Sequence, residues 1–193
     1  MTDKFKAPFE ALEKLKKGNQ DYISALTNPA SIELDLRKNL ATNGQQPYAV
    51  ILTCSDSRVA PEHIFSAGLG ELFVIRTAGN VVGDFELGSI EYGVEHLGAP
   101  IIVVMGHNHC GAVEAALSGH AEGYIEKIVH KVKNVITGAE NAKQAEEMNI
   151  LNSIQDILKS DIVSRLIQTG KISLVGAKYD IETGLVDFYK SES

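Results

Sequence analysis

Three apolar runs with little polar alternation are the feature that most constrains the fold of this chain. They cover residues 48–53, 72–76 and 101–105. Strict apolar and polar alternation would indicate strands with one face in water, whereas continuous apolar runs are typical of parallel strands covered on both faces. Segments with helical periodicity separate these runs. Strands that alternate with helices predict an α/β layered domain with right-handed crossovers.

The rest of the chain completes this scheme. Near the carboxyl end, two apolar segments joined by a turn predict a fourth parallel strand and an antiparallel edge strand. We therefore predict an α/β fold with a central, mostly parallel sheet of four strands plus an antiparallel edge strand, flanked by helices and preceded by an N-terminal helical arm. The expected helices cover residues 8–27, 31–42, 84–97 and much of 110–169, and the last two strands cover 171–179 and 184–189.

The chain is expected to form one domain, residues 1–193, with the helical arm at 1–43 and the α/β core at 44–193. Its 18 basic and 25 acidic residues give a net charge of −7, which disfavours nucleic-acid binding. No apolar run approaches the roughly 20 residues that span a bilayer. The first residues lack the pattern of a secretory signal, so we predict a cytoplasmic protein without a membrane partner.

The residues that carry chemistry follow two of the predicted strands. Cys54 comes directly after the first strand, and His107 and Cys110 come after the third as His-x-x-Cys. The carboxyl ends of parallel strands open into one crevice, so we expect these side chains to meet there. Two thiolates and one imidazole favour tetrahedral zinc with an open fourth position, as in catalytic sites. Two alternatives stay open, namely simple packing of Cys54 and a cysteine nucleophile with His107 as its base.

Asp56 and Arg58 lie two and four residues beyond Cys54. A carboxylate at this place can become a fourth metal ligand or accept a hydrogen bond from metal-bound water. A bidentate guanidinium would hold the carboxylate in a fixed plane and keep it ionised. Alternatively, Asp56 caps the following helix, or the pair is an exposed ion pair of little energetic value. His109 is expected to lie beside the site or on the surface.

Together these motifs resemble the β-class carbonic anhydrases. The resemblance rests on the following segments: Cys54-Ser55-Asp56-Ser57-Arg58-Val59, Gly106-His107-x-x-Cys110-Gly111, Gly70-Glu71-Leu72-Phe73-Val74-Ile75-Arg76 and Ser89-Ile90-Glu91-Tyr92. It extends from about Gly18 to Phe188. It implies a carbonate dehydratase, a zinc lyase that reversibly hydrates carbon dioxide to bicarbonate and a proton through attack of zinc-bound hydroxide. One Zn²⁺ per subunit and a homodimer or homotetramer are also implied.

The resemblance assigns roles to single residues. It implies that Cys54, His107 and Cys110 bind zinc and that Asp56 and Arg58 form a catalytic dyad, with Asp56 as the fourth ligand in a closed state. The remaining implied residues are Gln45, Phe73 and Tyr92 as substrate contacts, the aromatic pair in a cleft partly contributed by a second subunit, and His96 as a proton shuttle or a surface histidine.

The start of the helix after Cys110 suggests one more substrate contact. The backbone N–H groups of Gly111 and Ala112 are expected to bind a bicarbonate oxygen there. Two other functions remain open. The same scaffold could hydrolyse a carbon dioxide analogue such as carbonyl sulfide or carbon disulfide, or the chain could be a zinc-binding sensor without turnover. Asp56, Arg58 and Gln45 argue against a sensor, because a structural site needs no open position lined by polar groups.

Overall fold

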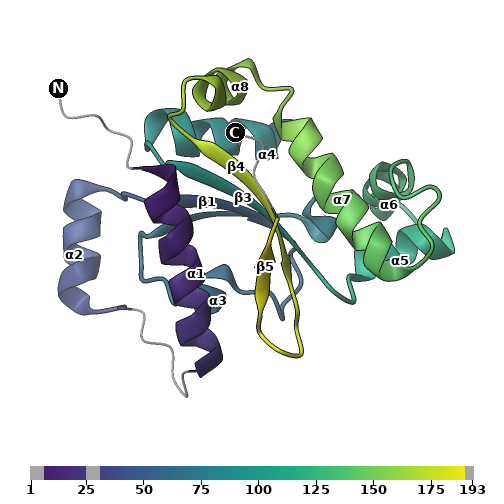
Figure 1. The fold of residues 1–193 in the computed structure, drawn as a ribbon, viewed down its shortest axis with the longest axis horizontal. Helices are drawn as coiled ribbons and strands as arrows, with labels where there is room; N and C mark the ends of the chain where they lie inside the picture. The colour runs from purple at the N-terminus through teal and green to yellow at the C-terminus, as the bar shows by residue number, and fades with distance from the viewer. Residues whose placement is uncertain (1–6, 25–30, 190–193) are drawn as a thin grey trace.

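A computed structural model describes residues 7–24 and 31–189 of the chain. Its centre is a five-stranded sheet with the strand order β2-β1-β3-β4-β5 (Figure 1). All neighbouring strands pair in parallel except β4 and β5, which are antiparallel. The predicted fold class is therefore confirmed. The strands are β1 Ala49–Thr53, β2 Leu72–Arg76, β3 Ile101–His107, β4 Ser173–Tyr179 and β5 Val186–Phe188.

Both faces of the sheet are covered, which explains why the central strands are apolar throughout. All five residues of β1 and all seven of β3 are buried. Alternate residues enter different cores: Ile51 packs in the core beneath α1, whereas Val50 and Leu52 pack in the core beneath α4, α7 and α8. The helices are α1 Pro8–Ser24, α2 Leu34–Asn43, α3 Pro61–Ile64, α4 Asp84–Glu91, α5 Gly111–Ser118, α6 Ile125–Lys133, α7 Ala142–Ile157 and α8 Asp161–Gln168, with two short turns, η1 Ala78–Asn80 and η2 Tyr92–His96. Among the described residues, no helix is both long enough and apolar enough to cross a membrane.

Several element boundaries differ from the predicted ones. The first helix is described to Ser24, and residues 25–27 of the prediction lie outside the described residues. The helix expected over 84–97 changes to a π-helical turn at Tyr92, a distortion that recurs at functional sites. The strand expected to end at residue 105 continues to His107, because the β3–β4 ladder pairs His107 with Tyr179. His107 therefore belongs to the strand and does not follow it.

Helix α1 is anchored to two distant parts of the core. The side chain of Asn19, which is buried, donates hydrogen bonds to the carbonyl oxygens of Ile64 and Gly184 and accepts one from the N–H of Val186. Gly18 lies beside it on the same buried side of the helix. A Cβ atom at position 18 would overlap the backbone carbonyl of Phe65. The helix can approach α3 this closely only because residue 18 has no side chain.

We therefore expect Gly18→Ala to lower the free energy of unfolding by about 1–3 kcal/mol, because the added methyl group must push α1 away from a backbone atom. Denaturant unfolding at a fixed protein concentration measures this change. Gly88→Ala is the matched control, since a Cβ at that helical, exposed position meets nothing within 4 Å. Equal stability of the Gly18→Ala and wild-type proteins would contradict the close packing of α1.

Candidate metal centre

The carboxyl ends of β1 and β3 bring together the three predicted metal donors. Cys54 follows the last residue of β1, His107 is the last residue of β3, and Cys110 is the N-cap of α5. The nitrogen and sulfur atoms that could bind a metal all lie within 4.8 Å of one another. All three side chains are buried. Neighbouring parallel strands thus gather donors that are far apart in the sequence, as expected for the end of such a sheet.

His107 is oriented as a metal ligand would be. Its Nδ1 lies 2.8 Å from the carbonyl oxygen of Asn108, which can only accept a hydrogen bond, so Nδ1 carries the proton. The lone pair is then on Nε2, which is buried and has no hydrogen-bond partner among the described residues. A backbone carbonyl that fixes the tautomer of a histidine is a common support for a metal ligand. The orphaned Nε2 atom fits a bound metal ion.

The two thiols form a coupled pair with opposite tendencies to ionise. A hydrogen bond from Cys110 lowers the pKa of Cys54 to about 4, against the effect of burial. The same hydrogen bond, together with burial, raises the pKa of Cys110, although the N–H groups of Val113 and Ala112 oppose this rise. Both cysteines are free thiols. Two thiolates this close repel each other. A divalent cation would remove that repulsion, since it neutralises both negative charges.

Asp56 and Arg58 form a bidentate pair beside the three donors. Nε and one terminal nitrogen of Arg58 donate to the two carboxylate oxygens of Asp56 at 2.9 and 2.7 Å. The same terminal nitrogen also donates to the carbonyl oxygen of His109 at 3.1 Å. Hydrogen bonds from Arg58 hold the pKa of Asp56 far below its usual range. Helix α3 is capped by Ala60, so Asp56 does not cap it, and its Oδ2 lies 4.0 Å from Nε2 of His107.

Two further groups contact the site, although neither was predicted to do so from the sequence. Arg76, at the carboxyl end of β2, donates to the carbonyl oxygens of Cys54 and Asp56 at 3.1 and 2.7 Å. The N–H of Gly79 donates to the sulfur of Cys54 at 3.2 Å. The position of Arg76 at the end of a neighbouring strand was a usable signal. Gly79 acts through its backbone, so no side-chain pattern could reveal it.

The expected substrate contacts do not gather at these donors within one chain. Phe73 and Tyr92 have ring centroids 6.0 Å apart, and His96 stacks on Tyr92 at 5.2 Å. Phe73 lies three residues before the end of β2, about 10 Å along the strand from its carboxyl end. Gln45 is exposed in the loop before β1. Phe73, Tyr92 and His96 therefore form an aromatic group beside β2, at the edge of the sheet.

The start of α5 lies directly after the third donor, because Gly111 and Ala112 follow Cys110. The N–H of Ala112 acts on the sulfur of Cys110 together with that of Val113, and it lowers the pKa of that thiol. Gly111 is the first residue of the helix and is exposed, so its N–H remains the candidate contact at this end.

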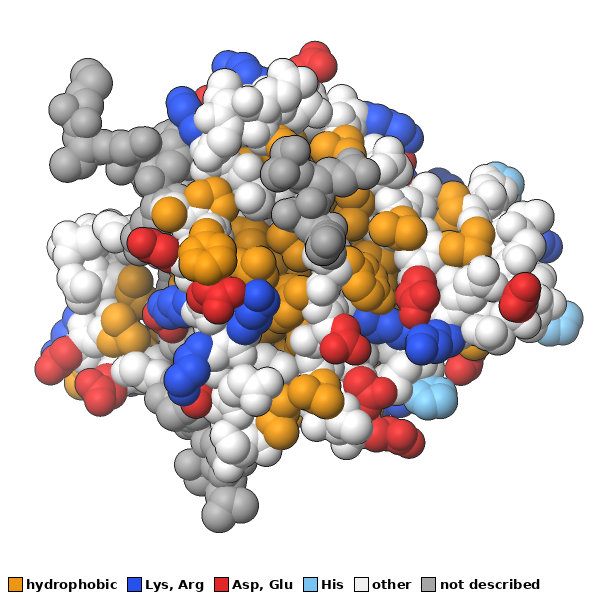
Figure 2. Space-filling model, in the orientation of Figure 1, with side chains coloured by type: hydrophobic (Ala, Val, Ile, Leu, Met, Phe, Trp, Pro, Cys, Tyr) orange, Lys and Arg blue, Asp and Glu red, His pale blue; other side chains and the backbone are white. Residues whose placement is uncertain are grey.

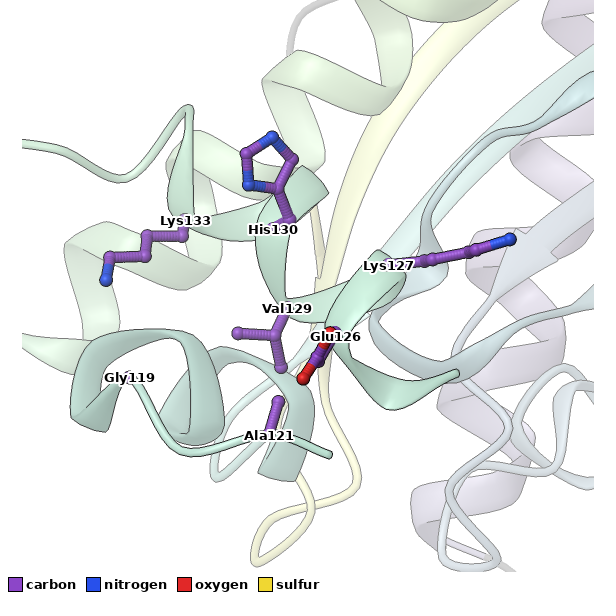
Figure 3. A pocket seen from close by; sticks show the side chains of 7 residues that line it. All are labelled: Gly119, Ala121, Glu126, Lys127, Val129, His130 and Lys133. Atoms are coloured by element: carbon purple, nitrogen blue, oxygen red, sulfur yellow. The ribbon is translucent and has the colours of Figure 1, made fainter. Parts of the chain in front are cut away.

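A cavity of about 480 Å³ between α5 and α6 contains none of the metal donors. Its lining includes Lys127, His130 and Lys133, which extend in different directions from the helix (Figure 3). Their charges do not converge on one point that a ligand could occupy. We regard this cavity as a surface hollow and not as part of the reaction site.

Comparison with known proteins agrees with this geometry. Residues 49–186 match the family model described as carbonic anhydrase. "Carbonic anhydrase 2" of Mycobacterium tuberculosis is 38% identical over 188 residues, which cover 92% of this chain and 90% of the relative. A carbonic anhydrase of Mycolicibacterium smegmatis is 36% identical and covers 93% of this chain, with 92% of its own length matched.

Solved structures give the same result. The β-carbonic anhydrase CcaA is 29% identical and superposes with a TM-score of 0.74, covering 93% of this chain and 95% of its own. The Coccomyxa β-carbonic anhydrase in complex with acetazolamide is 26% identical with a TM-score of 0.72, covering 95% and 84% of the two chains. The fold and the Cys-His-Cys group define an α/β enzyme with three donors that could hold a metal ion. The chain belongs to the β-class carbonic anhydrases, and it is a carbonate dehydratase.

Proposed function

We propose that this chain reversibly hydrates carbon dioxide to bicarbonate and a proton, with one Zn²⁺ per subunit held by Cys54, His107 and Cys110. The observation that carries the proposal is a buried set of two sulfurs and one nitrogen within 4.8 Å, with Nε2 of His107 otherwise unpaired. Three protein donors leave the fourth tetrahedral position open. Zinc in such a site acts as a Lewis acid that makes hydroxide available at neutral pH to attack carbon dioxide.

In this proposal Asp56 and Arg58 orient the attacking oxygen. Arg58 holds both oxygens of the ionised Asp56, so the carboxylate can only accept a hydrogen bond. An oxygen that donates its proton to Asp56 must present a lone pair in another direction, toward the carbon of the substrate. The carbonyl of His109 holds Arg58 on its other side. If Arg58 releases Asp56, the carboxylate is free to become a fourth ligand and to close the site.

We also propose that the substrate cleft needs a second copy of the chain. Gln45 and Tyr92 are exposed, and they lie away from the donors of their own chain, so they suit the site of a neighbouring subunit. Helix α2 buries none of its residues, and hydrophobic side chains such as Ile32 and Leu34 are 71% and 56% exposed. Hydrophobic groups also gather over the face that carries α1 and β5 (Figure 2). Two solved β-carbonic anhydrases from Sordaria macrospora are tetrameric.

The remaining residues have roles in the same scheme. The N–H of Gly111 contacts a bicarbonate oxygen, and Phe73 contributes to the apolar side of the cleft. His96, stacked on Tyr92, passes the released proton to solvent. We further propose that the protein works in a reducing compartment such as the cytoplasm, because oxidation of its two cysteines to a disulfide would remove two zinc ligands.

Metal content and the pH dependence of hydration test this function together. We expect about one zinc per subunit and a stopped-flow hydration rate that rises between about pH 6 and 9. Cys54 and Cys110 would bring two negative charges to a bound ion, so water there would be less acidic than beside three neutral imidazoles. Asp56 is ionised throughout this range, because its pKa is held low, and it adds no acid limb near neutrality.

Two results would contradict the proposal. Protein without stoichiometric zinc would remove its basis. Zinc-loaded protein that releases sulfide from carbonyl sulfide, but hydrates carbon dioxide no faster than buffer, would favour hydrolysis of the analogue. A hydration rate that falls as the pH rises would contradict the role given to the two thiolates.

A further inference from the structure

The turn η1 presents a backbone donor to one of the two metal-binding sulfurs. The N–H of Gly79 points to Sγ of Cys54 at 3.2 Å. Gly79 and Asn80 both have left-handed backbone conformations, with φ of 70° and 46°. Asparagine adopts this conformation at some cost in free energy, and two such residues in succession do not persist without contacts that hold them. The direction of this N–H is therefore imposed by neighbouring structure.

Helix α7 supplies contacts to the carbonyl oxygens of this turn. The side chain of Asn149 donates to the carbonyl oxygen of Gly79 at 2.7 Å. The hydroxyl of Ser153, one turn later, lies 2.9 Å from the carbonyl oxygen of Asn80. All of these polar side chains are buried, with 1% of Asn149, 1% of Ser153 and 2% of Asn80 exposed. In a buried setting each hydrogen bond restrains the turn strongly, because water cannot replace it.

The opposite side of the turn is fixed by packing. A Cβ atom at Gly79 would lie 3.0 Å from Cβ of Ala112, in the first turn of the helix that follows Cys110. The turn is therefore held between α7 and the start of α5. The bond to Asn149 restrains the peptide that follows Gly79, and Ala112 limits movement on the other side, so the preceding peptide, which carries the N–H of Gly79, has little freedom to turn. In the observed conformation this N–H points to the sulfur of Cys54.

We propose that Asn149, assisted by Ser153, is a positioning residue that sets the donor strength of Cys54 toward the metal. A hydrogen bond from an N–H group draws electron density from a thiolate and fixes the direction in which the sulfur faces a metal. Residues that hydrogen-bond to metal ligands and orient them commonly contribute about 10–100-fold to metal affinity. Asn149 donates to Gly79, and it acts on Cys54 through that residue. This inference rests on the proposed zinc site.

The test compares Asn149→Leu with Asn152→Leu, a matched change on the same helix. Leucine is close in size to asparagine but cannot donate to Gly79. Asn152 is partly buried, and its amide lies 3.5 Å from Asp156, which is not part of the turn. Each protein is loaded with Co²⁺ to record the sulfur-to-cobalt charge-transfer band, and zinc affinity is measured by competition with a chelator.

For Asn149→Leu we expect the band to move to longer wavelength, because a thiolate without the N–H donor gives up its electron more easily. Zinc affinity should fall by about 10–100-fold. Asn152→Leu should match the wild type in both measurements. A change confined to general stability would not move the band.

The outcomes separate this inference from the proposed function. A folded Asn149→Leu protein with the wild-type band and affinity overturns the inference and leaves the zinc site intact. A wild-type protein that binds Co²⁺ without a thiolate band overturns both. If Asn149→Leu does not fold, Ser153→Ala decides the matter. It should shift the band in the same direction by a smaller amount, and an unchanged band would overturn the inference.

Discussion

Replacing Cys110 with serine should remove stoichiometric zinc from the purified protein and lower carbon dioxide hydration by at least about a thousandfold, since a metal of this kind contributes several kcal/mol to catalysis. The serine hydroxyl stays protonated near pH 7, so it offers neither the charge nor the soft donor of a thiolate. The N–H groups of Val113 and Ala112, which favour the ionised form of Cys110, would then act on a neutral hydroxyl. Metal analysis and stopped-flow hydration on the same sample measure both effects.

Ser118→Ala is the control, because Ser118 ends the same helix and its hydroxyl only contacts the carbonyl oxygen of Ala115. It should keep both the metal and the rate. The corresponding change at Cys54 separates the alternatives that the sequence left open. A Cys54→Ser protein that retains zinc but loses activity would favour a cysteine nucleophile. Loss of both zinc and activity fits a metal ligand, and retention of both would leave Cys54 as a packing residue.

Most of the fold could be predicted, because strands that are buried on both faces consist largely of apolar residues. Continuous apolar runs predicted a sheet covered on both faces, and β1 and β3 are fully buried. The same reasoning placed Cys54 and Cys110 near each other, since it needed only the ends of two strands. It failed at Tyr92, where the helical pattern continues but the backbone widens to a π turn. That change is made by backbone hydrogen bonds, which side-chain periodicity does not specify.

The backbone contact to Cys54 and the residues that position it could not be predicted from sequence patterns, for a similar reason. Gly79 contributes an N–H group, and Asn149, 70 residues away in sequence, contributes the contact that aims it. Neither residue type is unusual by itself, and their relation exists only once α7 packs on the turn. The partner surface of α2 is a different case. The helix could be predicted, but Ile32 and Leu34 are exposed in one chain, and their cover by a second copy is part of the function proposed above.

Arg58→Ala should lower hydration by at least about 100-fold while zinc stays bound at about one per subunit, because the substitution leaves all three metal donors in place. Arg58 holds both carboxylate oxygens of Asp56. Without it, the pKa of Asp56 rises toward the usual value of about 3.9, so the carboxylate is still ionised at neutral pH. The loss is therefore one of orientation and not of charge.

Without Arg58, Asp56 would need only a small movement to reach the three donors, since its Oδ2 already lies 4.0 Å from Nε2 of His107. It can take the open fourth position and exclude water from it. Adding Asp56→Ala to Arg58→Ala should then leave the rate unchanged or raise it, because the blocking carboxylate is gone. Arg58→Lys should resemble Arg58→Ala, since a single ammonium cannot hold two oxygens in one plane.

Arg165→Ala is the matched control for the loss of a guanidinium. Arg165 is 61% exposed and only approaches Glu95 at 3.5 Å, so its removal should not change the hydration rate. The decisive comparison is the double variant against Arg58→Ala. If the double variant is much slower than the single one, Asp56 still assists hydration without Arg58, and the closing movement is wrong. If Arg58→Ala hydrates carbon dioxide as fast as the wild type, the bidentate pair has no part in the reaction.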